Sequence, residues 1–212
     1  SGVLDAGTGA VSLTNTNGTI TFTSSSGQVR GGALTVMAKD SISLNSNVTF
    51  LTATVTDPAG TFTIDEVNSL TIKSAVQTSG GDINITAGQG PSDYLGGTGT
   101  INAASGNVNL TLDGYMYLAG SVGQVRGNAL TINATGFAVV ETAVNEVTAA
   151  ISGAGQRIDI RDEDGLVVGA GGVTTNSGSL SLTAGKSTTG NLSGSGVLDA
   201  GTGAVSLTNT NG

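Results

Sequence analysis

The chain of 212 residues holds 35 glycines and no cysteine or histidine, and only 10% of its residues are charged, with a net charge of −8. This composition excludes disulfide scaffolds and sites built on histidine or cysteine, and the negative charge argues against a nucleic acid partner. No run approaches 18 apolar residues, so no membrane span is expected, while an apolar content of 37% allows a buried interior.

Pairs of apolar residues separated by one small or polar residue recur along the whole chain, as in half-buried β-strands. In chain order, the pairs are Val11/Leu13, Leu34/Val36, Phe62/Ile64, Ile83/Ile85, Val108/Leu110, Leu130/Ile132, Ile158/Ile160, Leu180/Leu182 and Val205/Leu207. The first members are 23, 28, 21 and 25 residues apart, and then 22, 28, 22 and 25, so that each set of four adds to 97. This spacing predicts four coils in each stretch of 97 residues, with the nine first members in one inward stack.

Two longer repeats support this count. Residues 195–212 repeat residues 1–18 letter for letter, and the segment GQVRGGALTV at 27–36 returns as GQVRGNALTI at 123–132. We therefore expect one four-coil module over 1–97, a second over 98–194, and the start of the next identical tandem unit over 195–212. Residues 195–212 should repeat the conformation of residues 1–18, eight coils further along.

The predicted fold class is all-β: a right-handed parallel β-helix, or β-solenoid, with about eight coils per 194-residue unit and three short strands per coil. A helical fold is excluded because no period of 3.6 residues occurs and glycine and β-branched residues abound. An antiparallel sandwich has no reason to repeat, whereas a solenoid is built by stacking similar units.

Four residues are candidates for an interaction surface. Asp93 and Tyr94 lie in one of two glycine-rich segments, 88–99 and 185–196, which we expect to protrude from the rod. Tyr115 and Tyr117 in the segment DGYMYL should point outward from one strand. Each pair has a plain alternative, since loops tolerate insertions and tyrosine favours strands for packing reasons alone.

The densest charge run, IRDEDG at 160–165, suggests calcium binding at first sight. However, placing Gly165 at the sixth position of an EF-hand loop puts Ile160 at the first and Gly171 at the twelfth, so the pattern fails. We expect a solvated corner in which Arg157 and Arg161 lie beside acids, with no metal and no cofactor. Because the loops are short and most features are duplicated, we expect no catalytic residues and no enzyme.

The strands GDINITAG at 81–88 and GSLSLTAG at 178–185 resemble those of filamentous-haemagglutinin-type exoproteins and related β-strand-repeat adhesins of bacteria. The resemblance implies a secreted, extracellular fibre at the cell surface, with roles in adhesion or extracellular matrix. Its partners would be neighbouring copies of the same repeat, lateral fibres or surface carbohydrate. The alternative is a β-helix that binds or degrades polysaccharide.

Overall fold

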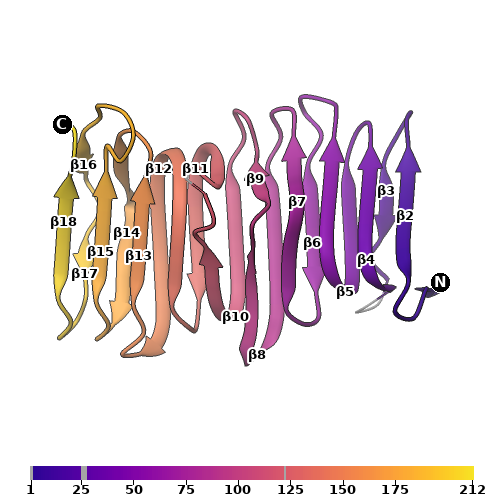
Figure 1. Cartoon of the computed structure of the whole chain (residues 1–212), viewed down its shortest axis with the longest axis horizontal. Coiled ribbons are helices and arrows are strands. Elements are labelled where there is room, and N and C mark those ends of the chain that lie inside the picture. Colours follow the sequence, from indigo (N-terminus) through magenta and orange to yellow (C-terminus); the bar gives the residue numbers. More distant parts are fainter. Residues whose placement is uncertain (1, 25–27, 122) are drawn as a thin grey trace.

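A computed structural model describes residues 2–24, 28–121 and 123–212, and these ranges form strands without any helix (Figure 1). Ser1 and Gly27, which belong to the repeated segments, lie outside the described residues. The strands are β1 (Leu4–Asp5), β2 (Ala10–Asn15), β3 (Ile20–Phe22), β4 (Val29–Ala38), β5 (Ile42–Val55), β6 (Phe62–Glu66), β7 (Leu70–Thr78), β8 (Ile83–Gly97), β9 (Thr100–Asn102), β10 (Val108–Leu118), β11 (Val125–Ala134), β12 (Ala138–Ala154), β13 (Ile158–Asp162), β14 (Leu166–Asn176), β15 (Leu180–Ala184), β16 (Leu192–Gly194), β17 (Leu198–Asp199) and β18 (Val205–Asn209). Within these ranges, no long apolar helix of the kind that crosses a membrane occurs.

The strands pair in parallel, each with the strand one coil earlier and one coil later, so the predicted β-solenoid is confirmed. Figure 1 shows the strands lying across the long axis while the chain advances from one end of the rod to the other. One ladder of paired residues runs the full length: Ala10, Ala33, Phe50, Thr71, Gly96, Tyr117, Val139, Asp159, Ser181, Ser206. We call the sheet that carries it face A.

This ladder corrects the coil count. It takes nine steps from Ala10 to Ser206, not the expected eight, and Ser206 is the counterpart of Ser12 in the repeated segment. One 194-residue unit therefore closes on nine coils to within two residues. At a strand spacing of about 4.8 Å, the unit rises about 43 Å along the axis.

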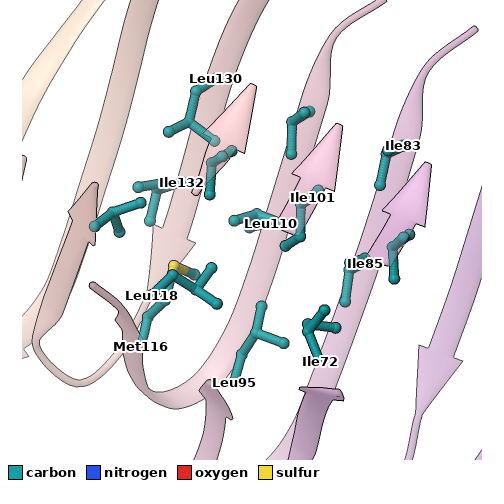
Figure 2. Close-up of a cluster of buried hydrophobic side chains, with 14 of the residues drawn as sticks. Ile72, Ile83, Ile85, Leu95, Ile101, Leu110, Met116, Leu118, Leu130 and Ile132 are labelled. Atoms are coloured by element: carbon teal, nitrogen blue, oxygen red, sulfur yellow. The ribbon is translucent and has the colours of Figure 1, made fainter. Parts of the chain in front are cut away.

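A second ladder forms the opposite sheet, face B, and each coil contributes a strand to both faces. It runs through Ile20, Ile42, Phe62, Ile83, Val108, Leu130, Val147, Val168 and Gly194. The inward residues of the two faces meet in a dry core, of which Figure 2 shows the middle, with Ile72, Ile83 and Leu110 among the labelled side chains. Sheet-on-sheet burial of this kind is the main stabilising term of the fold.

The prediction of a single inward stack is wrong. Val11, Leu34, Ile158, Leu180 and Val205 lie on face A, whereas Phe62, Ile83, Val108 and Leu130 lie on face B. The two 28-residue steps explain the difference, because Leu34 pairs one coil on with Leu51, and Phe62 lies a further half coil along. Each stretch of 97 residues, for which the spacing predicts four coils, therefore contains four and a half.

The second 97-residue repeat is thus rotated by half a turn about the rod axis relative to the first. Val11 of face A corresponds to Val108 of face B, and the pairing of β2 with β4 recurs as the pairing of β10 with β11. Likewise, β5 pairs with β6 and β7 as β12 pairs with β13 and β14. The two faces of the rod therefore carry related strands, displaced by half a unit along the axis.

The longest strands replace the three short strands expected in each coil. The first half of β5 pairs with β6 on face B, and its second half pairs with β4 on face A. Its alternation of buried and outward residues continues through Ser46 and Val48 and shifts phase only at Thr49–Phe50. Because the inward alternation runs past the corner, the strand bends from one face to the other instead of ending.

The two copies of the repeated segment take the same local conformation, as predicted. β1 and β17 cover the same residues of the repeat, and Gly7 and Gly201 have φ angles of 58° and 57°. The turn hydrogen bonds from Gly9 N to Ala6 O and from Gly203 N to Ala200 O are both 2.8 Å long. A left-handed φ of this kind is what a glycine readily adopts in a tight turn.

Candidate functional site

Two kinds of polar group among the described residues could carry function: buried groups that recur in both modules, and a group on face A that occurs once. Glu66 represents the first kind. Its fully buried carboxyl accepts hydrogen bonds from Ser46 Oγ at 2.6 Å, Val48 N at 3.0 Å and Asn68 N at 3.2 Å. The bonds satisfy a group that would otherwise be costly to bury.

Asp162 repeats this arrangement in the second module. It accepts hydrogen bonds from Thr142 Oγ1 at 2.7 Å, Val144 N at 3.2 Å and Asp164 N at 3.1 Å. Every donor is the counterpart, 96 residues on, of a donor to Glu66. Asp162 belongs to the charge run 160–165, so the expectation that this run is wholly a solvated corner is wrong.

Burial also dominates the acidity of both groups. Desolvation raises the pKa of the Glu66 carboxyl to about 7, although its hydrogen bonds act in the opposite direction. Desolvation likewise raises the pKa of the Asp162 carboxyl to about 7. Each carboxyl is sealed in the core, so neither can reach a substrate.

Two other buried polar pairs are also kept in both modules. Gln28 accepts a bond from Ser24 N and donates to Gly2 O, as Gln124 accepts from Gly120 N and donates to Gly99 O. Thr78 and Thr175 each donate to the glycine carbonyl three residues on. Residues retained in both halves of a half-turn repeat serve the scaffold at equivalent corners.

The group on face A begins with a stack of side chains. The rings of Tyr94 and Tyr115 are 5.9 Å apart and nearly parallel, those of Tyr115 and Phe137 are 5.1 Å apart, and the guanidinium of Arg157 lies 5.6 Å from the centre of the Phe137 ring. These residues come from successive coils, where parallel pairing in register places like positions above one another. We call these four residues the ring stack.

The ring stack shows how the predicted surface residues are used. The rings face one another along the rod axis, so the faces of the middle rings are covered and their edges point outward. A sugar that binds by stacking needs an open ring face, which Tyr115 does not offer. The hydroxyl groups of Tyr94 and Thr71 are hydrogen-bonded at 3.0 Å.

Asp93 and Tyr117 differ in how far their side chains are available to a partner. The Asp93 carboxyl accepts bonds from Gln89 N, Gly90 N and Ser69 Oγ, which stabilise a short bulge opposite β10. The glycine-rich segment 88–99 therefore lies largely within β8, and its residues 89 and 93–96 pair with β10. Tyr117 is 53% exposed and is the one candidate of the four that offers an open side chain to a partner.

An ion-pair cluster lies beside the ring stack on face A. The buried Glu141 carboxylate receives Lys186 Nζ at 2.6 Å and Arg161 Nη1 at 3.5 Å, and Arg161 also pairs with Asp159. Arg157 of the expected corner belongs instead to the ring stack. The two acidic and two basic side chains balance in formal charge, and each of the two cations contacts a carboxylate.

The ring stack and the ion-pair cluster together form what we call the face A patch, which begins with Tyr94 near the end of the first module and continues into the second. The counterparts of Tyr94, Tyr115, Phe137 and Arg157 are Asn191, Thr19, Ser41 and Thr61. The counterparts of Glu141, Asp159, Arg161 and Lys186 are Asn45, Thr63, Asp65 and Gln89. The counterparts do not reproduce the patch, so it appears once in each 194-residue unit.

Sequence patterns alone did not bring Phe137 and Arg157 to the tyrosines. The usable signal was positional: each of the four residues directly precedes an inward residue, namely Leu95, Met116, Ala138 or Ile158. In the described ranges, no group of three or more acidic side chains is arranged to hold a metal ion. Comparisons with family models, curated proteins and solved structures find no match to this chain.

Proposed function

We propose that this chain is a structural repeat segment of a long extracellular β-solenoid fibre, or giant surface adhesin, that projects from a cell or forms matrix. The observation that carries the proposal is the pair of identical 18-residue segments, which take the same conformation nine coils apart. A unit that spans a whole number of coils can be added repeatedly while the rod keeps its direction.

The face A patch supports a role in binding in addition to a structural role. In tandem units, the patch recurs on one face about every 43 Å. Tyr117 lies on the same face, two coils before Asp159 of the patch. Together with the half-exposed Arg161, it would be displayed in a row toward a neighbouring fibre or a surface carbohydrate. Many weak sites on one rod bind more tightly together than singly, which suits an adhesin.

Electron microscopy tests this proposal. Cells that produce the protein are labelled with gold-conjugated antibodies raised against this chain, and the purified native protein is imaged in negative stain. The proposal expects unbranched rods at the cell surface, labelled at intervals along their length. Isolated globular particles, or label confined to the cell interior, would overturn it.

The alternative of a polysaccharide-cleaving β-helix is less well supported. A catalytic carboxylate must reach the glycosidic bond, whereas Glu141 is buried between two cations and Asp159 is paired with Arg161. An assay for new reducing ends, with the rods and a panel of polysaccharides, distinguishes the two functions.

A further inference from the structure

The two ends of the rod are open sheet edges. At the C-terminal end, Val205 and Leu207 of β18 are 47% and 52% exposed, although both belong to the inward-facing alternation. At the N-terminal end, β1 and β2 pair with β4 on one side only. Unpaired edges of this kind bind further strands.

The C-terminal edge already shows what such a strand would be. Residues 195–212 have the sequence of residues 1–18, and they lie on β14 and β15. Leu180 pairs with Val205, Leu182 with Leu207, and Val173 with Leu198. Every residue of this seated segment thus has an identical counterpart at the N-terminal edge.

The main-chain bonds of this contact are regular. Leu180 N donates to Ala204 O at 2.8 Å and Val173 N to Val197 O at 2.9 Å, while Asn211 Nδ2 donates to Gly185 O at 2.6 Å. The acceptors Ala204 and Val197 and the donor Asn211 correspond to Ala10, Val3 and Asn17.

The first copy shows the other side of the same segment. Val11 pairs with Leu34, Leu4 N donates to Gln28 O at 2.9 Å, and Lys39 N donates to Asn15 O at 3.0 Å. The segment 195–212 therefore shows how the start of a unit contacts the preceding unit, and residues 1–18 show how it contacts the rest of its own unit. Together they describe a complete junction between two units.

We propose that the edge formed by β14 and β15 is the docking surface for the N-terminal edge of a second copy of this chain, an inference that rests on the proposed fibre function. The register is Leu180 to Val11, Leu182 to Leu13 and Val173 to Leu4 of the second copy. The contact joins two different surfaces and leaves both outer ends open, so it builds a filament and not a closed ring.

In the 212-residue chain, the segment 195–212 occupies its own docking surface and blocks a second copy. A second copy should therefore reach this docking surface only after the segment 195–212 is released. The double substitution Val205→Asp and Leu207→Asp places charges against Leu180 and Leu182, which should detach the seated segment 195–212 from β14 and β15. Ser206→Pro, which removes a main-chain N–H, gives a second way to release it.

Because the chain has no cysteine, single cysteines report the register directly. Ser181 pairs with Ser206, whose counterpart in the next copy is Ser12. Full chains carrying Ser12→Cys and Ser181→Cys, with and without each release change, are oxidised mildly and separated on non-reducing gels. The proposal expects a ladder of linked dimers and trimers from the released chains and monomers from the chain with an intact β18.

Two controls make every outcome informative. A chain with Ser181→Cys and Ser206→Cys should form an internal disulfide, and failure to do so would remove the seated segment on which the proposal rests. Circular dichroism reports whether the released chains keep their strands. Released chains that remain folded and monomeric, by either release route, overturn the proposal.

The fibre function and the docking surface can be tested separately. If the released chains link but the native protein is globular in the electron microscope, the docking surface stands and the fibre function falls. If native rods are seen but the released chains do not link, the junction proposed here is wrong and the fibre function remains.

Discussion

Glu66 and Asp162 are buried on opposite faces of the rod and accept the same three hydrogen bonds from corresponding donors. Their positions, 96 residues apart, differ by half a turn because the internal repeat spans four and a half coils. The two copies of the internal repeat can therefore be compared with each other. Residues that both copies keep serve the fold, and residues that only one copy has are free for another purpose.

The first prediction concerns pH. Since burial raises the pKa of both carboxyls to about 7, the folded state favours their protonated forms. This stabilisation is complete below the ordinary pKa values near 4 and is lost as the pH rises through 7. Between pH 5 and pH 8, the free energy of unfolding should fall by at most about 2 to 3 kcal/mol for each carboxyl, and the urea midpoint should fall with it.

Substitution separates these two groups from the other acids. Glu66→Gln should make the pH dependence shallower, because the amide stays neutral at every pH. Asp65→Asn changes the adjacent, exposed acid and should leave the slope unchanged. A Glu66→Gln slope equal to that of the parent chain would show that the carboxyl does not titrate in this range.

A second prediction tests the inward alternation. Ile132 is fully buried and pairs with Leu110 and Ala149, whereas its neighbour Thr131 points outward. Ile132→Asp should lower the free energy of unfolding by about 4 kcal/mol, because it leaves an unpaired charge in a dry core. Thr131→Asp, measured in the same urea titration, should cost less than about 1 kcal/mol. Equal effects would mean that the strand faces are misassigned.

The third prediction distinguishes a packed tyrosine ring from an exposed one on β10. Tyr115→Ala removes the middle ring of the ring stack and should lower stability by about 2 kcal/mol. Tyr117→Ala removes an exposed ring and should change stability by less than about 0.5 kcal/mol. If the effects were reversed, Tyr117 would be the buried ring and Tyr115 the available one.

Simple alternation was enough to predict strands, the solenoid and most inward residues. It was not enough to place them on faces, because the 28-residue step from Leu34 to Phe62 hides the pairing of Leu34 with Leu51. The burial of a charged residue was harder still to predict. Asp162 reads as part of a polar run, and only the three-dimensional position of Thr142 and Val144 shows why an acid is tolerated inside.

The face A patch was half predicted for a similar reason. Tyr94 and Tyr115 stand out in a chain with few aromatic residues, but their contact depends on the register between β8 and β10. Phe137 and Arg157 join them only because the same register continues through β12 and β13. Such a register follows from the shared core, which no single strand encodes.

X-ray fibre diffraction from aligned native rods tests the central claim most directly. Parallel strands across the axis give a layer line near 4.8 Å, and tandem units give a longer axial repeat. Nine coils per unit predict that the 4.8 Å layer line is the ninth order of a repeat of about 43 Å. An eighth-order relation, or the absence of a 4.8 Å layer line, would contradict the account.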